Sequence, residues 1–233
     1  MSETEQFANP DLIWRPEQLK EKLRDENLVI LDLRPTHEVM GGIIPGAAHL
    51  DIYGLGLSHT RGENFDEFIQ LMRSQLGLRG VSPDKTVVLV EEETGNRAGR
   101  AFWLLEYMGH QDVHVLDGGM QAWRAAGMET TQQMNAPKAA RFPVNPQPQL
   151  FISSDDLHKR LGDPNLVILD TRSDKEWSGE NKRGGPRGGT IPGAVHLEWR
   201  NFIAENGCLK SPAELTSMLS TVGITRDKPT VPF

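Results

Sequence analysis

The fold is decided by residues 86–100, which read TVVLVEEETGNRAGR. The apolar run at 86–90 is typical of a buried strand, and the residues from Asn96 onwards have the spacing of an amphipathic helix. A strand that passes into a helix through a tight loop is where α/β proteins place anion-binding and catalytic groups, because free backbone amides and the helix dipole converge there. The residues of this loop therefore decide which chemistry the chain can support.

Short apolar runs alternate with helical patterns on both sides of this stretch. Besides the strand at 86–90, the sequence predicts strands at 28–31, 48–50 and 113–116, and helices at about 15–24, 65–76, 98–108 and around Trp123. Such alternation predicts an α/β fold with a parallel sheet and right-handed crossovers.

The composition argues against several classes of function. The 233 residues carry a formal net charge of −7 without a basic run, so neither nucleic acid nor an anionic membrane surface is an expected partner. No apolar run approaches the roughly 18 residues of a membrane span, and the acidic N-terminus lacks the pattern of a signal peptide. Cys208 is the only cysteine, which excludes an internal disulfide and a cysteine-based metal cluster. We therefore expect a cytoplasmic protein.

Two blocks of sequence occur twice in the same order. NLVILDLR at 27–34 returns as NLVILDTR at 165–172, and IPGAAHL at 44–50 returns as IPGAVHL at 191–197. Two matching blocks in the same order indicate a duplicated domain.

The duplication predicts four consecutive segments. They are a loose N-terminus at 1–11, a first domain at 12–130, a Pro-rich linker at 131–149 and a second domain at 150–233. The second copy matches the first only as far as the counterpart of the strand at 86–90, and Phe233 follows soon after. We expect the second domain to be incomplete, with an unfinished sheet and low stability.

These motifs together resemble the rhodanese family in its tandem form, the thiosulfate and 3-mercaptopyruvate sulfurtransferases. The motifs are DLR at 32–34, IPGA at 44–47, LDGG at 116–119, DTRSDKEW at 170–177 and IPGA at 191–194. The resemblance implies a three-layer domain around a central parallel sheet, duplicated, with the second copy incomplete.

The resemblance also implies a catalytic loop that opens with a cysteine and has an arginine five positions later. In the family this cysteine forms a persulfide and passes sulfur from a small-molecule donor, thiosulfate or 3-mercaptopyruvate, to cyanide or a thiol, without a cofactor or a metal. Counting back from Arg97 places Glu92 at the cysteine position. The matching loop comprises Glu92, Glu93, Thr94, Gly95, Asn96 and Arg97. A carboxylate cannot carry sulfur, and the tandem family keeps its nucleophile in the second domain, which here ends before its loop.

Charged pairs and a basic insertion have both a structural and a functional interpretation. Asp32 with Arg34, and Asp170 with Arg172, are either acid–base or anion-binding groups, or each Asp caps its strand end and accepts hydrogen bonds from loop amides while its Arg pairs nearby; the structural role is the commoner one. The insertion KRGGPR at 182–187 either steers an anionic donor or forms a solvated loop, and a solvated loop is the commoner case.

Three further candidates have weaker sequence support. Cys208 lies in a polar turn without the arginine that would make a thiol reactive, so we expect a bystander. His110 and His114 are four residues apart, but Gly109 and the strand that follows interrupt any helix that would align them, which argues against a metal site. Arg97 and Arg100 either bind an anion or neutralise the neighbouring glutamates.

Two functional hypotheses follow. The chain is a rhodanese-family sulfurtransferase that is inactive as given because it lacks the loop cysteine, or its first domain is a non-catalytic binding or regulatory module.

Overall fold

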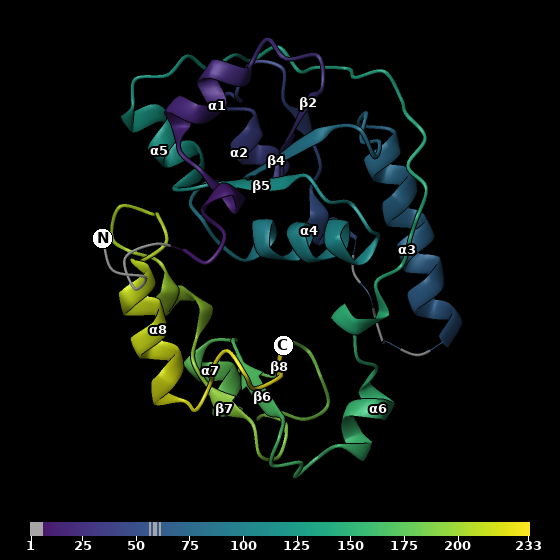
Figure 1. Ribbon diagram of the computed structural model, residues 1–233, viewed down its shortest axis with the longest axis vertical. Coiled ribbons are helices and arrows are strands. Elements are labelled where there is room, and N and C mark those ends of the chain that lie inside the picture. The colour runs from purple at the N-terminus through teal and green to yellow at the C-terminus, as the bar shows by residue number, and fades with distance from the viewer. Residues whose placement is uncertain (1–6, 56, 58–59, 61) are drawn as a thin grey trace. The chain divides into compact units, whose positions relative to one another are not determined.

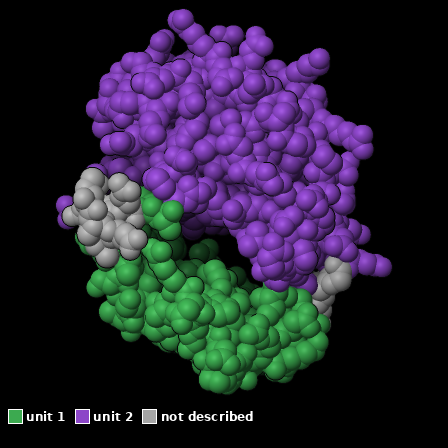
Figure 2. Space-filling view, in the orientation of Figure 1, with its two compact units in different colours: residues 1–8, 152–204, 210–233 green, residues 9–151, 205–209 purple. Residues whose placement is uncertain are grey.

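The computed structural model describes residues 7–55, 57, 60 and 62–233, so part of the expected loose N-terminus, residues 1–6, lies outside the described residues. Two compact units make up the chain (Figure 2). The large unit comprises residues 9–151 and 205–209, and the small unit comprises residues 152–204 and 210–233 together with 7–8. The large unit therefore includes five residues from within the second repeat.

The described residues of the large unit form a five-stranded parallel sheet in the order β1-β5-β4-β2-β3. Its strands are β1 (Ile13–Trp14), β2 (Leu28–Asp32), β3 (Ala48–His49), β4 (Thr86–Val90) and β5 (Val113–Leu116). In the centre, Val88 of β4 is paired with Ile30 on one side and with His114 on the other. The strand expected at 86–90 is thus the central strand of the sheet.

Helices cover both faces of this sheet (Figure 1). The α-helices are α1 (Pro16–Lys22), α2 (Thr36–Val39), α3 (Gly62–Gly77), α4 (Asn96–Tyr107) and α5 (Gly119–Ala125), and the short 3-10 helices are η2 (Pro10–Leu12), η3 (Ile52–Gly54) and η4 (Pro148–Leu150). Successive side chains of a strand point to opposite faces. Accordingly Val87 and Leu89 pack with α3 and α4 in one core, while Val88 and Val90 pack with α1, α2 and α5 in the other. The sheet is therefore the middle of three layers.

The Pro-rich segment after α5 lies against the large unit, and we call residues 131–147 the strap. The amide of Ala140 donates to the carbonyl oxygen of Gly77 at 2.8 Å, and the amide of Asn145 donates to that of Met108 at 2.9 Å. Phe142, 3% exposed, belongs to the core that contains α3 and α4. The strap is therefore held by both backbone hydrogen bonds and apolar packing.

The small unit repeats part of this architecture around a parallel sheet in the order β7-β6-β8. Its elements are α6 (Ser154–Lys159), β6 (Val167–Asp170), α7 (Asp174–Trp177), β7 (Val195–His196), η5 (Trp199–Phe202), α8 (Pro212–Thr221) and β8 (Thr230–Pro232). Within the described part of the chain β8 pairs with β6 alone, whereas its counterpart β4 has a neighbour on each side. Helix α8 has no buried residue, whereas α3, which precedes β4 as α8 precedes β8, includes the buried Phe65, Phe68, Ile69, Met72 and Leu76.

The structure confirms the expected fold class. Both units have an α/β fold with a parallel sheet, and the order β7-β6-β8 repeats the order β3-β2-β4 of the large unit. Among the described residues, no helix has the length and the apolar character that crossing a lipid bilayer requires.

Candidate functional site

The carboxyl-terminal edge of the large sheet brings the predicted loop and the DLR motif together. Strands β2, β4 and β5 run parallel and end at Asp32, Val90 and Leu116, so the residues that follow them lie at one edge. In open α/β sheets this is the edge at which ligands bind.

Asp32 and Arg34 form a buried ion pair at this edge. The Nη2 atom of Arg34 lies 2.7 Å from Oδ2 of Asp32, and the two side chains are 2% and 1% exposed. The same nitrogen donates to the carbonyl oxygen of Gly42 at 2.7 Å. Hydrogen bonds to Asp32 raise the pKa of Arg34 against the opposing effect of burial. The pair thus anchors the loop after α2 to the end of β2.

Glu92, at the position that the family resemblance assigns to a cysteine, is held between two arginines. Its Oε2 atom lies 3.3 Å from Nη1 of Arg34, and its Oε1 atom accepts a hydrogen bond from Arg124 of α5. With 41% of its side chain exposed, Glu92 lies at the surface of the loop.

The neighbouring Glu91 points inward instead and is only 8% exposed. Its Oε1 atom accepts a hydrogen bond of 3.0 Å from the backbone amide of Ala98, in the first turn of α4. Burial raises the pKa of Glu91 to about 7, although the amides of Ala98, Arg97 and Gly95 and the charge of Arg97 favour the ionised form. The amides that a loop of this kind offers to an anion are therefore directed at a carboxylate of the chain itself.

Sequence reasoning missed this role of Glu91. The available signal was its position directly after four consecutive buried residues of β4, because helices cover both faces of the sheet and a side chain on either face is enclosed there.

The start of α5 holds the loop from the other side. The amides of Met120 and Gln121 donate to the carbonyl oxygens of Glu91 and Glu92 at 2.8 and 2.9 Å. Gly119 lies between the two chain segments with a φ of +51°, and a Cβ atom there would come within 2.2 Å of the Glu91 carbonyl oxygen. This close approach explains why the second glycine of the LDGG motif, Gly119, has no side chain.

Residues 205–209 of the second repeat complete the large unit at the same loop. The amide of Thr94 donates to the carbonyl oxygen of Gly207 at 2.9 Å. The Oδ1 atom of Asp117 accepts hydrogen bonds of 2.8 Å from the Thr94 hydroxyl and from the amide of Leu209. Burial, with the charge of Asp117, raises the pKa of the Cys208 thiol. The sequence gives no local signal for this packing.

The two arginines of α4 contact the residues after β3. Arg97 forms an ion pair of 3.0 Å with Asp51, and its guanidinium lies 4.5 Å from the ring centre of Tyr53. Arg100 donates to the carbonyl oxygens of Ile52 and Leu55 at 3.3 and 2.8 Å. Each arginine thus ties α4 to the chain around η3.

The small unit reproduces the Asp–Arg arrangement at the end of β6. Arg172 pairs with Asp170 and donates through Nη2 to the carbonyl oxygen of Gly189 at 3.0 Å. The hydroxyl of Thr190 also donates to Asp170, at 2.7 Å. Burial alone would raise the pKa of Asp170, but these hydrogen bonds hold it below its usual range. In the inserted loop, Arg183 pairs with the buried Glu176 at 3.0 Å.

The two histidines considered as metal ligands contact the chain instead. His110 lies 3.2 Å from the carbonyl oxygen of Ser82 through Nε2, and His114 lies 2.8 Å from Asp112 through Nε2. His114 also stacks on Trp14 with 4.1 Å between the ring centres. The described residues contain no group of three or more potential ligands that could hold a metal ion.

The large unit is a three-layer α/β domain with a strand–loop–helix unit at the carboxyl edge of its sheet, and the small unit repeats the part of this domain that precedes the loop. The sequence model of the rhodanese-like domain family matches residues 15–126 and 153–231 of this chain. The chain therefore belongs to this family. The resemblance inferred from the sequence is therefore confirmed.

Known relatives extend over most of the chain. It is 32% identical over 222 residues to thiosulfate sulfurtransferase from Azotobacter vinelandii, covering 95% of this chain and 82% of that protein. It is 34% identical over 144 residues to a probable 3-mercaptopyruvate sulfurtransferase from Pseudomonas aeruginosa, covering 61% and 51%. The structure of SseA from Escherichia coli superimposes with a TM-score of 0.78 at 24% identity, covering 95% of this chain and 87% of that one. At that identity the superposition supports the fold alone.

Proposed function

We propose that the chain is a sulfurtransferase of the tandem rhodanese type by family, whose reaction moves sulfane sulfur from thiosulfate or 3-mercaptopyruvate to cyanide or a thiol, and that its 233 residues alone lack the cysteine that this reaction needs. The names of its relatives support the reaction class. In this reaction a cysteine thiolate attacks the outer sulfur of thiosulfate, the S–S bond breaks, and sulfite leaves with the electron pair. Cyanide then takes the terminal sulfur of the persulfide as thiocyanate and regenerates the thiolate.

The first repeat has a structural role in this proposal, and the observation that carries it is the buried carboxylate of Glu91 on the amide of Ala98. Glu92 adds a second carboxylate at the loop surface, held by Arg34 and Arg124. Two carboxylates at one loop repel an anionic donor, and neither can form a persulfide. We therefore assign no catalytic residue in the large unit.

Cys208 is also a poor nucleophile. Burial and the charge of Asp117 raise the pKa of its thiol, whereas sulfur transfer requires a thiolate. We accordingly expect the 233 residues alone to be inactive. We also propose that the protein is cytoplasmic and that the partners of the family reaction are a small-molecule sulfur donor and a small-molecule or thiol acceptor.

A thiocyanate assay tests this proposal. The purified chain, given thiosulfate and cyanide, should form thiocyanate no faster than its Cys208→Ser variant. Turnover that the substitution abolishes would make Cys208 the nucleophile and overturn the proposed role of the loop.

The closure of the loop favours one alternative, a non-catalytic binding or regulatory module. The Glu91 carboxylate accepts the hydrogen bond of the Ala98 amide, and Gly207 accepts that of the Thr94 amide. The loop of the first repeat is therefore occupied by groups of the chain itself, as a binding site is by its ligand. This alternative predicts that the chain binds a specific protein partner and that thiosulfate leaves its melting temperature unchanged. A melting temperature that rises with thiosulfate concentration would reject the alternative.

A further inference from the structure

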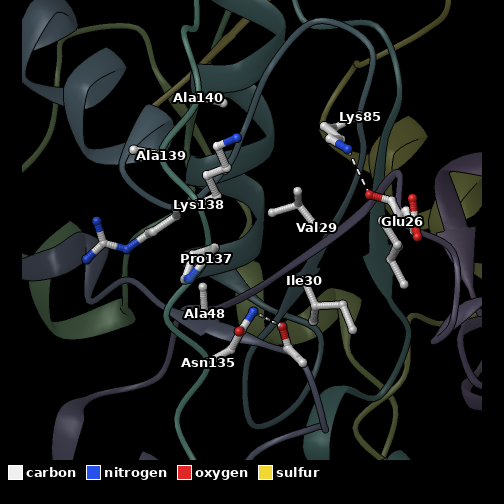
Figure 3. Close-up of a pocket in the computed structure, with 14 residues that line it drawn as sticks. Glu26, Val29, Ile30, Ala48, Lys85, Asn135, Pro137, Lys138, Ala139 and Ala140 are labelled. Carbon is white, nitrogen blue, oxygen red and sulfur yellow. Dashed lines mark hydrogen bonds between the residues drawn. The ribbon is translucent and has the colours of Figure 1, made fainter.

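A pocket of about 380 Å³ opens on the large unit, and it shares no residue with the loop after β4. It lies beside the first residues of β2 and the residue before β4, together with β3, the end of α3 and the strap (Figure 3). The start of parallel strands is the edge opposite to the candidate functional site. Any ligand of this pocket is therefore distinct from a sulfur donor at the loop.

The strap forms one wall of the pocket and is fixed at both ends. The side-chain amide of Asn135 donates to the carbonyl oxygen of Gly46 at 2.9 Å, and the amide of Ala140 donates to that of Gly77 at 2.8 Å. Between them the strap runs close to Gly80, where a Cβ atom would come within 3.4 Å of the Lys138 carbonyl oxygen. The pocket is thus already formed before a ligand binds.

Arg79 lines this pocket, and its guanidinium is held in place by neutral acceptors. Its Nε atom donates to the carbonyl oxygen of His49, and its Nη1 atom donates to the carbonyl oxygen and the side chain of Gln75 at 2.8 and 2.9 Å. Among the described residues no acceptor is found for Nη2, and no carboxylate lies within 4.0 Å of the guanidinium. Burial lowers the pKa of Arg79, and no acidic partner counteracts this effect. A guanidinium fixed by neutral groups, with one nitrogen left over, is suited to bind a carboxylate.

Two lysines add positive charge to the rim. Lys85 donates to the carbonyl oxygen of Glu26 at 2.7 Å and to the side chain of Asn27 at 3.3 Å, and both of these acceptors are uncharged. Lys138 is exposed on the strap, and in Figure 3 Val29 lies between it and Lys85. The one carboxylate among the lining side chains is that of Glu26, which is exposed. In a chain with a net charge of −7, this is a local excess of cations.

The remaining wall of the pocket is apolar. It includes Val29 and Ile30 of β2, Ala48 of β3 and Pro137 of the strap. Ligand sites commonly combine such walls with a few fixed polar groups, and the volume is at the lower end of those that hold small molecules.

We propose that this pocket binds a small organic carboxylate, with the carboxylate group at Arg79 and the apolar part between β2 and the strap.

Titration of the 233-residue chain with benzoate, followed by calorimetry and by amide chemical shifts, tests the proposal. Benzoate should bind saturably at one site and shift the amide signals of Gly80 and Ala140. Lys138→Glu should weaken binding at least about fivefold, since it replaces an attraction with a repulsion. Lys20→Glu makes the same charge change on an exposed residue of α1 outside the pocket and should alter the affinity by less than about twofold.

Arg79→Lys provides a second variant that keeps the charge but loses the guanidinium, and it should also weaken binding. Lys138 is exposed, so its variant tests the proposal even if Arg79→Lys fails to fold. Three results would overturn the proposal: no saturable binding of benzoate, equal effects of Lys138→Glu and Lys20→Glu, or equally tight binding of benzyl alcohol, which lacks the charge.

Discussion

The carboxylate of Glu91 lies 3.0 Å from the backbone amide of Ala98, so that the first turn of α4 donates to a side chain from the end of β4. A buried glutamate at a helix N-terminus is stabilised by the amides and the dipole, but burial penalises its charge. The balance places the pKa of Glu91 at about 7. The charge of the loop interior therefore changes near neutral pH.

The first prediction concerns Glu91→Gln and the pH dependence of stability. The pKa of Glu91 is about 7 in the folded chain against the ordinary 4.5 of a glutamate, so between these values the folded chain holds a proton that the unfolded chain has released. The free energy of unfolding should fall as the pH rises through this window, by up to about 3 kcal/mol. Glu91→Gln removes this contribution, so its stability relative to the unmodified chain should increase from pH 4.5 to pH 7 and then level off.

Urea denaturation at a series of pH values measures this difference. Using the difference between variants matters because burial lowers the pKa of His110, which makes its own contribution rise with pH. The control is Glu21→Gln, at an exposed position of α1. Parallel pH profiles for Glu91→Gln and Glu21→Gln would show that Glu91 does not titrate in this window.

The second prediction compares two glycines next to the loop. Gly119→Ala should destabilise the chain by at least about 2 kcal/mol, because its φ of +51° is unfavourable for alanine and its Cβ would overlap the Glu91 carbonyl oxygen. Gly99 is an exposed residue within α4, and no atom lies within 4 Å of a Cβ placed there. Gly99→Ala should therefore stabilise the chain by about 0.5–1 kcal/mol. Equal melting temperatures for the two variants would contradict the close approach of α5 to the loop.

The third prediction compares the Asp–Arg pairs of the two repeats. Arg34→Ala should cost about 3–5 kcal/mol, because it leaves the buried carboxylate of Asp32 without its ion-pair partner. Arg172→Ala should cost less, because Thr190 still donates to Asp170 and because Arg172 is 33% exposed. Chemical denaturation of both variants at pH 7 measures the two losses. A larger loss of unfolding free energy for Arg172→Ala than for Arg34→Ala would show that the pair in the large unit does not contribute more to stability.

The fourth prediction concerns limited proteolysis of the strap. Trypsin should cut after Arg183 or Arg187, in the exposed insertion of the small unit, before it cuts after Lys138 or Arg141. The strap is slower to open because Ala140 and Asn145 are hydrogen-bonded and Phe142 is buried. Mass spectrometry of early fragments identifies the first cut, and an initial cut within the strap would contradict its anchoring.

The central strand and the helix after it could be predicted because their signals are local. The apolar run of β4 occupies five residues and the spacing of α4 occupies twelve, and the repeated block that begins with NLVILD marks the end of β2 in the same way. The expected linker at 131–149 shows the limit of this approach. A single buried side chain, Phe142, gives no periodicity, so its packing against α3 and α4 leaves no local pattern.

The candidate site was predictable in position but not in its contacts. The loop and the pairing of Asp32 with Arg34 follow from motif and spacing. The inward direction of Glu91 depends on the nearby amide of Ala98 and on the start of α5, which is distant in sequence and fixes the loop through its carbonyl oxygens. The hydrogen bond from Thr94 to Gly207 joins residues from different repeats, and single-sequence patterns carry no information on such pairs.

The discontinuity of the large unit has a consequence for how the two repeats can vary. Residues 205–209 belong to the second repeat by descent but to the loop of the first by hydrogen bonding. Recombination that exchanged the second repeat for that of another protein would also exchange these loop partners. Thr94 and Asp117 would then lose the hydrogen-bond partners that they have here, so the two repeats are not freely interchangeable modules.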